Sequence, residues 1–293
     1  MRIVFIGTVE FSKNCLEKLI SINADIAGVC TKESSKFNSD FADITPLCKK
    51  NNIPYRFIED INSSDSINWI KELNPDIIFC FGWSSLIKET LLSLSPMGIL
   101  GYHPAKLPAN RGRHPIIWAL ALGLEETAST FFFMDEGADR GDIVSQKTIN
   151  ISYSDDAKSL YEKVIKTALI QIEELIPMLE NKTFIRKPQE HPNANYWRKR
   201  GKADGLIDFK MSSRAVYNLV RALGKPYPGA HINYNNEDII IWKVEEIEYN
   251  KKNIESGKVL KVQNETFTVK TYDGAVKILE HEFKKIPQEG TYL

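Results

Sequence analysis

Short β-rich runs alternate with amphipathic segments over the first 150 residues, and this pattern constrains the fold more than any other feature of the chain. Residues 2–7 are mostly β-branched or aromatic and end in glycine, and residues 10–20 place apolar side chains on one helical face. The run 76–82, DIIFCFG, is apolar enough for a parallel strand buried on both faces. Repeated strand–helix units of this kind predict an α/β domain built on a parallel or mixed sheet.

The same patterns predict the other elements of this domain. Strands are predicted at 25–31, 54–57, 98–103, 127–134 and 143–151. Helices are predicted at 44–51, 64–73, 84–94 and 114–123, followed by a long helix that Asp155 or Asp156 caps and that reaches about Glu180.

The chain changes character after this helix. Residues 181–194 are polar, carry two prolines and show no periodicity, which is typical of a linker. One helix at 212–223 and five short strands follow, and Asp273-Gly274 marks a hairpin turn between the last two strands. We therefore predict a Rossmann-like domain at 1–180, a linker at 181–194, and a smaller, mostly β, OB-like domain at 195–293. An exposed apolar edge on the small domain would allow a homodimer.

Composition narrows the classes of function. The chain has 38 Lys+Arg and 38 Asp+Glu, a balance that disfavours a broad nucleic-acid surface. No stretch reaches the roughly 18 apolar residues of a membrane span, and the amino terminus lacks a signal-peptide core, so we expect a cytoplasmic protein without membrane contact. The four cysteines match neither a zinc pattern nor a disulfide framework, so reduced thiols and no metal site are expected.

Common nucleotide motifs are absent from the sequence. The turn 7–11 follows the first strand but lacks the second and third glycines of G-x-G-x-x-G, which argues against an NAD enzyme. Neither a Walker A sequence nor H-E-x-x-H occurs. We interpret the turn as a tight strand-to-helix connection.

Two polar segments are candidates for a site. His103 ends a predicted strand and enters a loop with two prolines, two arginines and a glycine, where open α/β sheets keep their active sites. A lone histidine is more often structural, but this position makes it a candidate catalytic group. The segment 135–142, DEGADRGD, is either a solvated turn or a site. If the same sheet edge carries it, an aspartate would hold the His103 imidazole in one tautomer.

These residues resemble the folate-dependent formyltransferase family, which includes the sugar N-formyltransferases and methionyl-tRNA formyltransferase. The similarity runs through IGTVEF, FGWSSLI, HPAKLPANRG and MDEGADRGDI into RALGKPYPGA at 221–230, and it covers most of the chain. The combination of H-P-x-x-L-P-x-x-R-G with a later D-x-G-D is far more specific than either motif alone. The resemblance implies formyl transfer from 10-formyltetrahydrofolate to a primary amine through a tetrahedral intermediate.

The resemblance also assigns residues. His103 matches the family's general acid/base and Asp139 matches the aspartate that stabilises its protonated form, whereas Asp142 falls on the motif's second acid. The implied folate contacts are Ser85, Leu86, Ile87, Arg113, Asp135, Glu136, Gly137, Ala138 and Asp139.

One position departs from the family pattern. Gly101 stands where the family usually has an asparagine that donates to the oxyanion. Losing one such donor typically costs about 2.7–4 kcal/mol of transition-state stabilisation. Protonated His103, a backbone N–H or the side chain of Asn110, a candidate oxyanion or substrate contact, would replace it; otherwise the chain is slow or inactive.

The acceptor is argued from charge. Residues 191–293 carry 17 basic and 13 acidic side chains, a small excess for a tRNA-binding domain. The cluster of Arg198, Lys199, Arg200 and Lys202 is either a phosphate contact or a solvated edge. We therefore expect a dTDP- or UDP-linked 4-amino-4,6-dideoxy sugar as the acceptor. The alternatives are methionyl-tRNA formyltransferase, 10-formyltetrahydrofolate hydrolase and an inactive folate- or nucleotide-binding homologue.

Overall fold

A computed structural model describes residues 1–35 and 39–293, and the chain divides into two compact units. Unit 1 comprises Met1–Pro115, Thr127–Ile149 and Glu162–Trp197. Unit 2 comprises Ile116–Glu126, Asn150–Tyr161 and Arg198–Leu293. Residues 181–194, predicted as a linker, fall within unit 1. Each unit is therefore assembled from three stretches of the chain.

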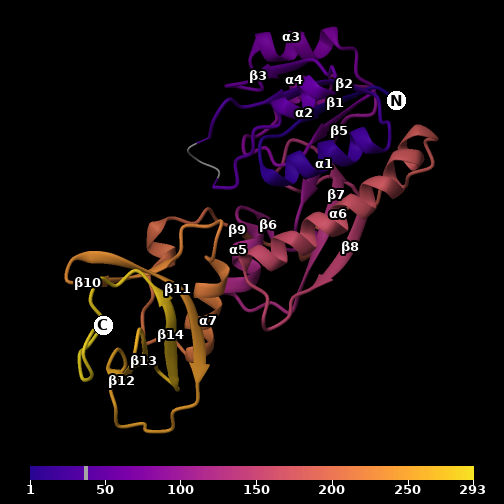
Figure 1. The fold of residues 1–293 in the computed structure, drawn as a ribbon. Helices are drawn as coiled ribbons and strands as arrows, with labels where there is room; N and C mark the ends of the chain where they lie inside the picture. Colours follow the sequence, from indigo (N-terminus) through magenta and orange to yellow (C-terminus); the bar gives the residue numbers. More distant parts are fainter. Residues whose placement is uncertain (36–38) are drawn as a thin grey trace. The chain divides into compact units, whose positions relative to one another are not determined.

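Unit 1 is built on a seven-stranded sheet in the order β3-β2-β1-β4-β5-β7-β8 (Figure 1). The strands β1 to β5 are parallel, whereas β7 runs antiparallel to β5, so the sheet is mixed. The strands are β1 (Ile3–Ile6), β2 (Ile26–Thr31), β3 (Tyr55–Phe57), β4 (Ile77–Cys80), β5 (Ile99–His103), β7 (Glu126–Phe133) and β8 (Ile143–Asn150). All four residues of β4 are buried, which confirms the central strand predicted at 76–82.

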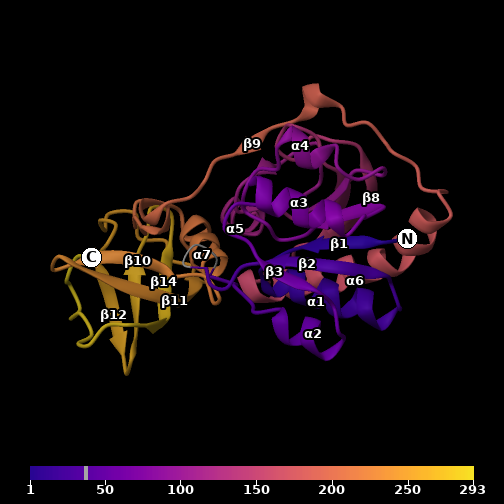
Figure 2. The same cartoon turned by 90° about the horizontal axis from the view of Figure 1, so that it is seen from above.

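Helices cover both faces of this sheet (Figures 1 and 2). The helices are α1 (Glu10–Ser21), α2 (Thr45–Lys50), α3 (Ser64–Glu72), α4 (Glu89–Leu92) and α6 (Ala157–Glu180). Alternate side chains of β1 divide between the faces: Val4 packs in one cluster with Ile70 of α3 and Leu91 of α4. Phe5 faces the other side, where Phe81 meets Phe11 of α1. The period of two along each strand therefore builds two apolar layers.

The connection after β1 is a tight turn, as its sequence indicated. The hydroxyl of Ser12 accepts the N–H groups of Thr8 and Val9 at 3.1 and 3.2 Å and donates to the Phe81 carbonyl at 2.6 Å. A methyl group on Gly7 would lie 2.7 Å from that carbonyl oxygen. The turn therefore uses its first amides to hold α1 against the end of β4.

The helix predicted at 84–94 is mostly absent, because only α4 is helical there. Asn62 replaces the missing helical hydrogen bonds of this segment. Its amide donates to the Leu86 carbonyl at 2.9 Å and accepts the Lys88 N–H at 2.8 Å. Residues 84–88 are therefore an extended loop pinned from the α3 side, a contact that local periodicity does not encode.

Unit 2 contains a five-stranded antiparallel sheet in the order β10-β11-β14-β13-β12. The strands are β10 (Ala230–Tyr234), β11 (Glu237–Ile247), β12 (Val259–Gln263), β13 (Thr266–Lys270) and β14 (Ala275–His281). Helix α7 (Ser213–Ala222) is capped at its N-terminus by Ser212, whose side chain accepts the Ala215 N–H. Helix α5 (Pro115–Ala121) also lies almost wholly in this unit. The predicted separate, mostly β domain is confirmed.

Short elements follow α6 on the way into unit 2. They are the 3-10 helices η1 (His191–Asn193) and η2 (Lys202–Gly205) and strand β9 (Tyr196–Trp197). Strand β9 pairs in parallel with β6 (Arg111–Gly112), which lies in the loop after His103. Figure 2 shows the chain after α6 running back along unit 1 to β9. Sequence patterns did not indicate this small ladder.

None of the helices formed by the described residues is long and apolar enough to cross a membrane. Among residues 1–35 and 39–293, no group of three His, Cys, Asp or Glu side chains is arranged to hold a metal ion. The four cysteines are all free and buried.

Candidate active site

His103 is the last residue of β5 and its side chain is almost fully buried, with 5% of the residue exposed. Side chains alternate along the strand, so His103 and Gly101 lie on the face opposite Tyr102, which stacks on Phe11 at 4.2 Å between centroids. The imidazole is therefore held on the face of the sheet that carries α3 and α4.

Asp139 lies beside this imidazole: its Oδ2 is 3.6 Å from His103 Nδ1. The predicted pair is therefore brought together, although the reason given for it was wrong. Strand β7 is antiparallel to β5, and Phe133 pairs with Leu100 rather than with His103. The carboxyl end of β7 thus lies at the opposite edge from His103, and the loop 134–142 carries Asp139 back to the ring.

The hydrogen bond of the other ring nitrogen, Nε2, shows which nitrogen of His103 carries a proton. His103 Nε2 lies 2.8 Å from the carbonyl oxygen of Asn110. A carbonyl can only accept, so Nε2 carries a proton and donates. The remaining nitrogen, Nδ1, faces the Asp139 carboxylate and is the position at which the ring gains or loses its second proton.

The Asp139 carboxylate is itself held in place. Its Oδ2 accepts the Gly112 N–H at 2.9 Å. The Asp139 backbone has a φ of 55°, a left-handed conformation that costs a non-glycine residue about 1 kcal/mol or more. Such a conformation persists only where surrounding contacts enforce it, so the loop fixes the position of this carboxylate.

The turn that leads to Asp139 has its own internal support. Asp135 accepts the Gly137 N–H at 2.9 Å and pairs with Arg140 at 2.8 Å. A methyl group on Gly137 would lie 2.0 Å from Arg140 Cδ, so the missing side chain lets Arg140 cross the turn. Glu136 and Ala138 are exposed on it.

The predicted folate contacts in the loop 84–88 divide by burial. Ser85 is exposed and Leu86 is 58% exposed, an unusual fraction for a leucine in a pinned loop. Ile87 is 1% exposed and packs in the same core cluster as Met134, the residue before the Asp135 turn. The residue that follows Leu86 and the residue that precedes Asp135 thus pack on the same core cluster.

Gly101, Asn110 and Arg113 complete the predicted set. A methyl group on Gly101 would lie 2.8 Å from Met134 Cγ and 3.1 Å from Phe132 Cζ, so neighbouring side chains fill the space that an asparagine would enter. Asn110 uses its backbone carbonyl for His103 and donates its N–H to Asn195 at 2.7 Å. Arg113 is exposed, and its backbone N–H donates to the Trp197 carbonyl.

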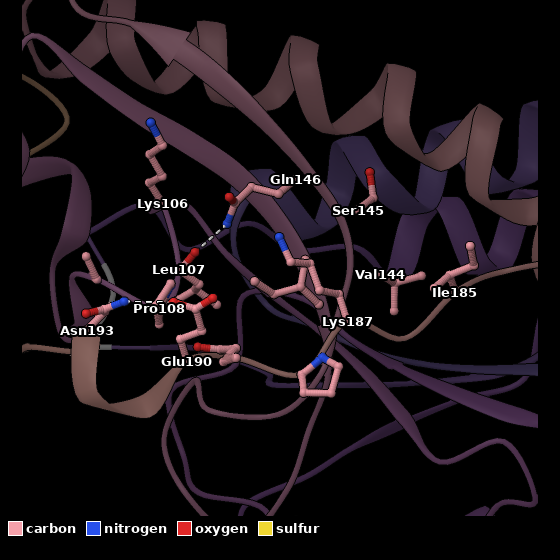
Figure 3. Close-up of a pocket in the computed structure, with 14 residues that line it drawn as sticks. Lys106, Leu107, Pro108, Val144, Ser145, Gln146, Ile185, Lys187, Glu190 and Asn193 are labelled. Carbon is pink, nitrogen blue, oxygen red and sulfur yellow. Dashed lines mark hydrogen bonds between the residues drawn. The ribbon is translucent and has the colours of Figure 1, made fainter.

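A cavity of about 660 Å³ lies beside the proline loop, which comprises residues 104–110 after His103 (Figure 3). The carbonyl of Leu107 accepts from Gln146 of β8 at 3.0 Å across it. The walls come from the proline loop, β8 and the chain after α6, and comprise Lys106, Leu107, Pro108, Ala109, Ile143, Val144, Ser145, Gln146, Ile185, Lys187, Pro188, Gln189, Glu190 and Asn193. His103 and Asp139 do not line this cavity, and sequence analysis did not anticipate it.

The mixed sheet and the separate antiparallel domain agree with comparisons to known proteins. The profile of the formyl transferase family matches residues 1–174, and that of the formyl transferase C-terminal domain matches residues 199–291. The chain belongs to the formyl transferase family, whose members are folate-dependent formyl-transfer enzymes.

Two relatives match the chain along its length. It is 30% identical to a methionyl-tRNA formyltransferase of Clostridioides difficile, an alignment that covers 100% of this chain and 96% of the relative. It is 32% identical to a methionyl-tRNA formyltransferase of Caldanaerobacter subterraneus, with 99% and 93% covered.

Solved structures support the fold. WlaRD, a sugar 3N-formyl transferase crystallised with dTDP and 5-N-formyl-tetrahydrofolate, superposes with a TM-score of 0.71 at 20% identity, covering 98% of this chain and 99% of that one. HypX from Aquifex aeolicus, in complex with tetrahydrofolic acid, superposes with a TM-score of 0.70 at 19% identity. The alignment covers 97% of this chain but only 44% of HypX, so this chain spans less than half of that larger protein.

Proposed function

We propose that this enzyme transfers the formyl group of 10-formyltetrahydrofolate to the primary amine of a nucleotide-linked 4-amino-4,6-dideoxy sugar, with His103 and Asp139 as its acid/base pair. The observation that carries the chemistry is the 3.6 Å approach of Asp139 Oδ2 to Nδ1 of a buried imidazole whose other nitrogen is already fixed. A carboxylate at that nitrogen stabilises the protonated ring.

The reaction needs one proton to be relocated. The amine nitrogen attacks the formyl carbon, the bond from that carbon to N10 breaks, and N10 takes up the proton that the amine releases. His103 exchanges its second proton on the Nδ1 side, beside Asp139, and thus serves as acid and base in turn. General acid–base catalysis by a positioned histidine contributes typically about 10²–10⁴-fold.

Charge on the tetrahedral intermediate also needs a donor, because Gly101 has no side chain. Two nearby backbone donors are already engaged, since the Asn110 N–H donates to Asn195 and the Gly112 N–H donates to Asp139. Both ring nitrogens of His103 face acceptors, so we assign stabilisation of the oxyanion to the positive charge of the protonated ring and not to one of its N–H groups, with the Asn110 side chain as the other candidate. Positive charge at this position replaces the missing amide hydrogen bond.

The loop 84–88 and the turn 135–139 suit a folate as cosubstrate. Leu86 presents an apolar side chain to solvent from a loop whose backbone Asn62 holds. An aromatic ring system would cover that exposed surface, and the polar turn 135–139 offers hydrogen-bonding groups. The proposed contacts remain Ser85 to Ile87, Arg113 and the turn 135–139.

Charge in unit 2 supports a small acceptor. Arg198 pairs with Asp204, Lys202 with Asp238, and Arg214 with Glu246. Arg200 lies over the Trp118 ring at 4.5 Å from its centroid. The basic cluster that a tRNA backbone would require is thus largely engaged within unit 2, whereas a nucleotide sugar needs only one or two cationic groups.

Methionyl-tRNA formyltransferase is the second candidate. The observation that favours it is the 30–32% identity to two proteins of that name along nearly the whole chain. The structural likeness to a sugar formyl transferase, at 20% identity, supports only the fold.

A direct assay separates the two candidates. The enzyme is incubated with 10-formyltetrahydrofolate and either dTDP- and UDP-linked amino sugars or methionyl-tRNA, and formylated product is detected by mass spectrometry. We expect turnover with an amino sugar and only a weak dependence of its KM on salt. Turnover with tRNA alone, with a KM that rises steeply with salt, would refute the sugar proposal.

The roles of the pair are tested in the same assay. We expect His103→Gln to lower kcat by about 10²–10⁴-fold. His281→Gln is the matched control, because His281 lies on β14 in unit 2, where its ring bonds to the Glu265 carbonyl and the Phe283 N–H. Unchanged transfer by His103→Gln would contradict the assignment.

A further inference from the structure

The chain after α6 reaches the acid/base pair through one buried amide. Gln189 is 7% exposed, although it lies in the polar segment predicted as a linker. Its Nε2 donates to the carbonyl of Asp139 at 3.0 Å and to the carbonyl of Gly141 at 2.7 Å. Gln189 thus clamps the backbone on both sides of residue 140 and supports the left-handed conformation of Asp139.

Arg111 fixes which way this amide points. Its Nε and Nη2 donate to Gln189 Oε1 at 3.2 and 2.6 Å. A guanidinium can only donate, so the amide oxygen must face Arg111 and the amide nitrogen must face the loop 139–141. The orientation of Gln189 is therefore set by chemistry and not by packing alone.

Arg111 is an unusual residue in its own right, because it is 1% exposed and, within the part of the chain that the structure describes, its guanidinium bonds to neutral side chains. Besides Gln189, it donates to the Tyr196 hydroxyl at 2.9 Å and to His191 Nδ1 at 3.1 Å. Its own backbone N–H donates to the Asn195 carbonyl at 3.1 Å. Burying a guanidinium among neutral partners costs free energy of folding. A use of Arg111 in function would account for that cost.

That use follows from the sequence neighbours of Arg111. The residue before it, Asn110, accepts from His103 Nε2, and the residue after it, Gly112, donates to the Asp139 carboxylate. Arg111 thus anchors the chain segment that holds both members of the pair. Through Gln189 it holds the Asp139 backbone as well.

We propose that Arg111 and Gln189 are positioning residues that set the geometry of the His103–Asp139 pair. The inference rests on the proposed function of that pair. It gives the segment after α6 a role in catalysis, exerted through the backbone of the loop 139–141.

Substitution of Gln189 tests the proposal. Gln189→Met keeps length and volume but removes the donors and the acceptor, and Gln189→Glu keeps an acceptor for Arg111 while removing both donors. A displacement of about 1 Å can cost on the order of 10²-fold, so we expect kcat to fall about 10–100-fold in both variants with KM within about twofold.

Gln171→Met is the matched control. Gln171 is a fully buried glutamine of α6 that donates to the Ser129 carbonyl of β7 at 3.2 Å and to Ser145 of β8 at 2.7 Å. We expect it to lower thermal stability and leave kcat unchanged. Equal losses of kcat in Gln171→Met and Gln189→Met would overturn the proposal in favour of a general structural effect.

Two further readouts separate positioning from stability. In an Asp139→Asn background, Gln189→Met should lower kcat by less than twofold further, because its effect passes through Asp139. The histidine-ring ¹⁵N NMR spectrum of the free enzyme should show a changed Nδ1 signal for His103 in Gln189→Glu but not in Gln171→Met. An unchanged His103 signal would overturn the clamp, whereas a changed signal with normal transfer by His103→Gln would overturn only the proposed function.

Discussion

Gly141 sits where the loop 134–142 returns toward β8, and its lack of a side chain is a geometric requirement. A methyl group there would lie 1.8 Å from the carbonyl oxygen of Phe133 and 3.4 Å from the N of Asp135. Ordinary contacts begin near 3.4 Å. The methyl group of Gly141→Ala must move from 1.8 Å to about 3.4 Å from the Phe133 oxygen. The substitution therefore forces the end of β7 and the loop apart by more than 1 Å.

The magnitude follows from what that movement breaks. The Phe133 N–H donates to the Asp142 carbonyl at 2.8 Å, and Gln189 donates to the Gly141 carbonyl at 2.7 Å. Weakening two hydrogen bonds costs about 1–3 kcal/mol together, and overpacking adds about 1–3 kcal/mol. We expect a loss of about 3 kcal/mol, which lowers Tm by about 6–12 °C. Displacing Asp139 by about 1 Å lowers kcat on the order of 10²-fold.

Differential scanning calorimetry and formyl-transfer kinetics measure the two effects. Gly201→Ala is the matched control, because a methyl group on Gly201 meets nothing within 4 Å. It should keep Tm within about 2 °C and leave kcat unchanged, as surface substitutions do. If Gly141→Ala matched this control in both measurements, the close approach of Gly141 to Phe133 and its link to Asp139 would be refuted.

Three further predictions concern other parts of the chain. Gly101→Asn should destabilise by about 1–3 kcal/mol in urea titrations because it overlaps Met134, and Met134→Ala in the same chain should restore part of that loss. Burial raises the pKa of all four thiols, that of Cys48 to about 11, so a disulfide reagent at pH 8 should modify them only on unfolding. Arg198, and then the Gly201 N–H, lower the pKa of Asp204. The Asp204 carboxylate should therefore stabilise the fold at pH values above the ordinary pKa of an aspartate, about 3.9. The difference in Tm between the parent protein and Asp204→Asn should shrink below about pH 4.

The elements of the fold were predictable because each obeys a local rule. Strand β4 is continuously apolar, Ser212 caps α7, and the turn at Asp273-Gly274 joins β13 to β14. The reversed direction of β7 was not predictable, because strand periodicity is the same in either direction. The loop 84–88 was missed for a similar reason, since a distant side chain, Asn62, satisfies its backbone.

The candidate site divides in the same way. His103 and Asp139 lie in motifs that a sequence displays, and the structure brings them within 3.6 Å. Gln189 carried no signal, because a single glutamine in a polar, proline-containing stretch resembles a solvated linker residue. The neighbouring Arg111 was visible only as a motif position. Its burial depends on β9 folding back beside it, a contact between residues more than eighty positions apart.

Unit 2 is built from three separate stretches of the chain, which limits how it can be exchanged with that of a relative. Its residues 116–126 and 150–161 precede the segment 198–293 in the chain and are separated from it by part of unit 1, yet Tyr153 stacks on Tyr217 at 4.6 Å between centroids. Arg221 donates to the carbonyls of residues 152, 153 and 155. A chimera that exchanges only residues 198–293 with a relative would strip these segments of their partners. Unit 2 can be exchanged between homologues only if all three segments are exchanged together.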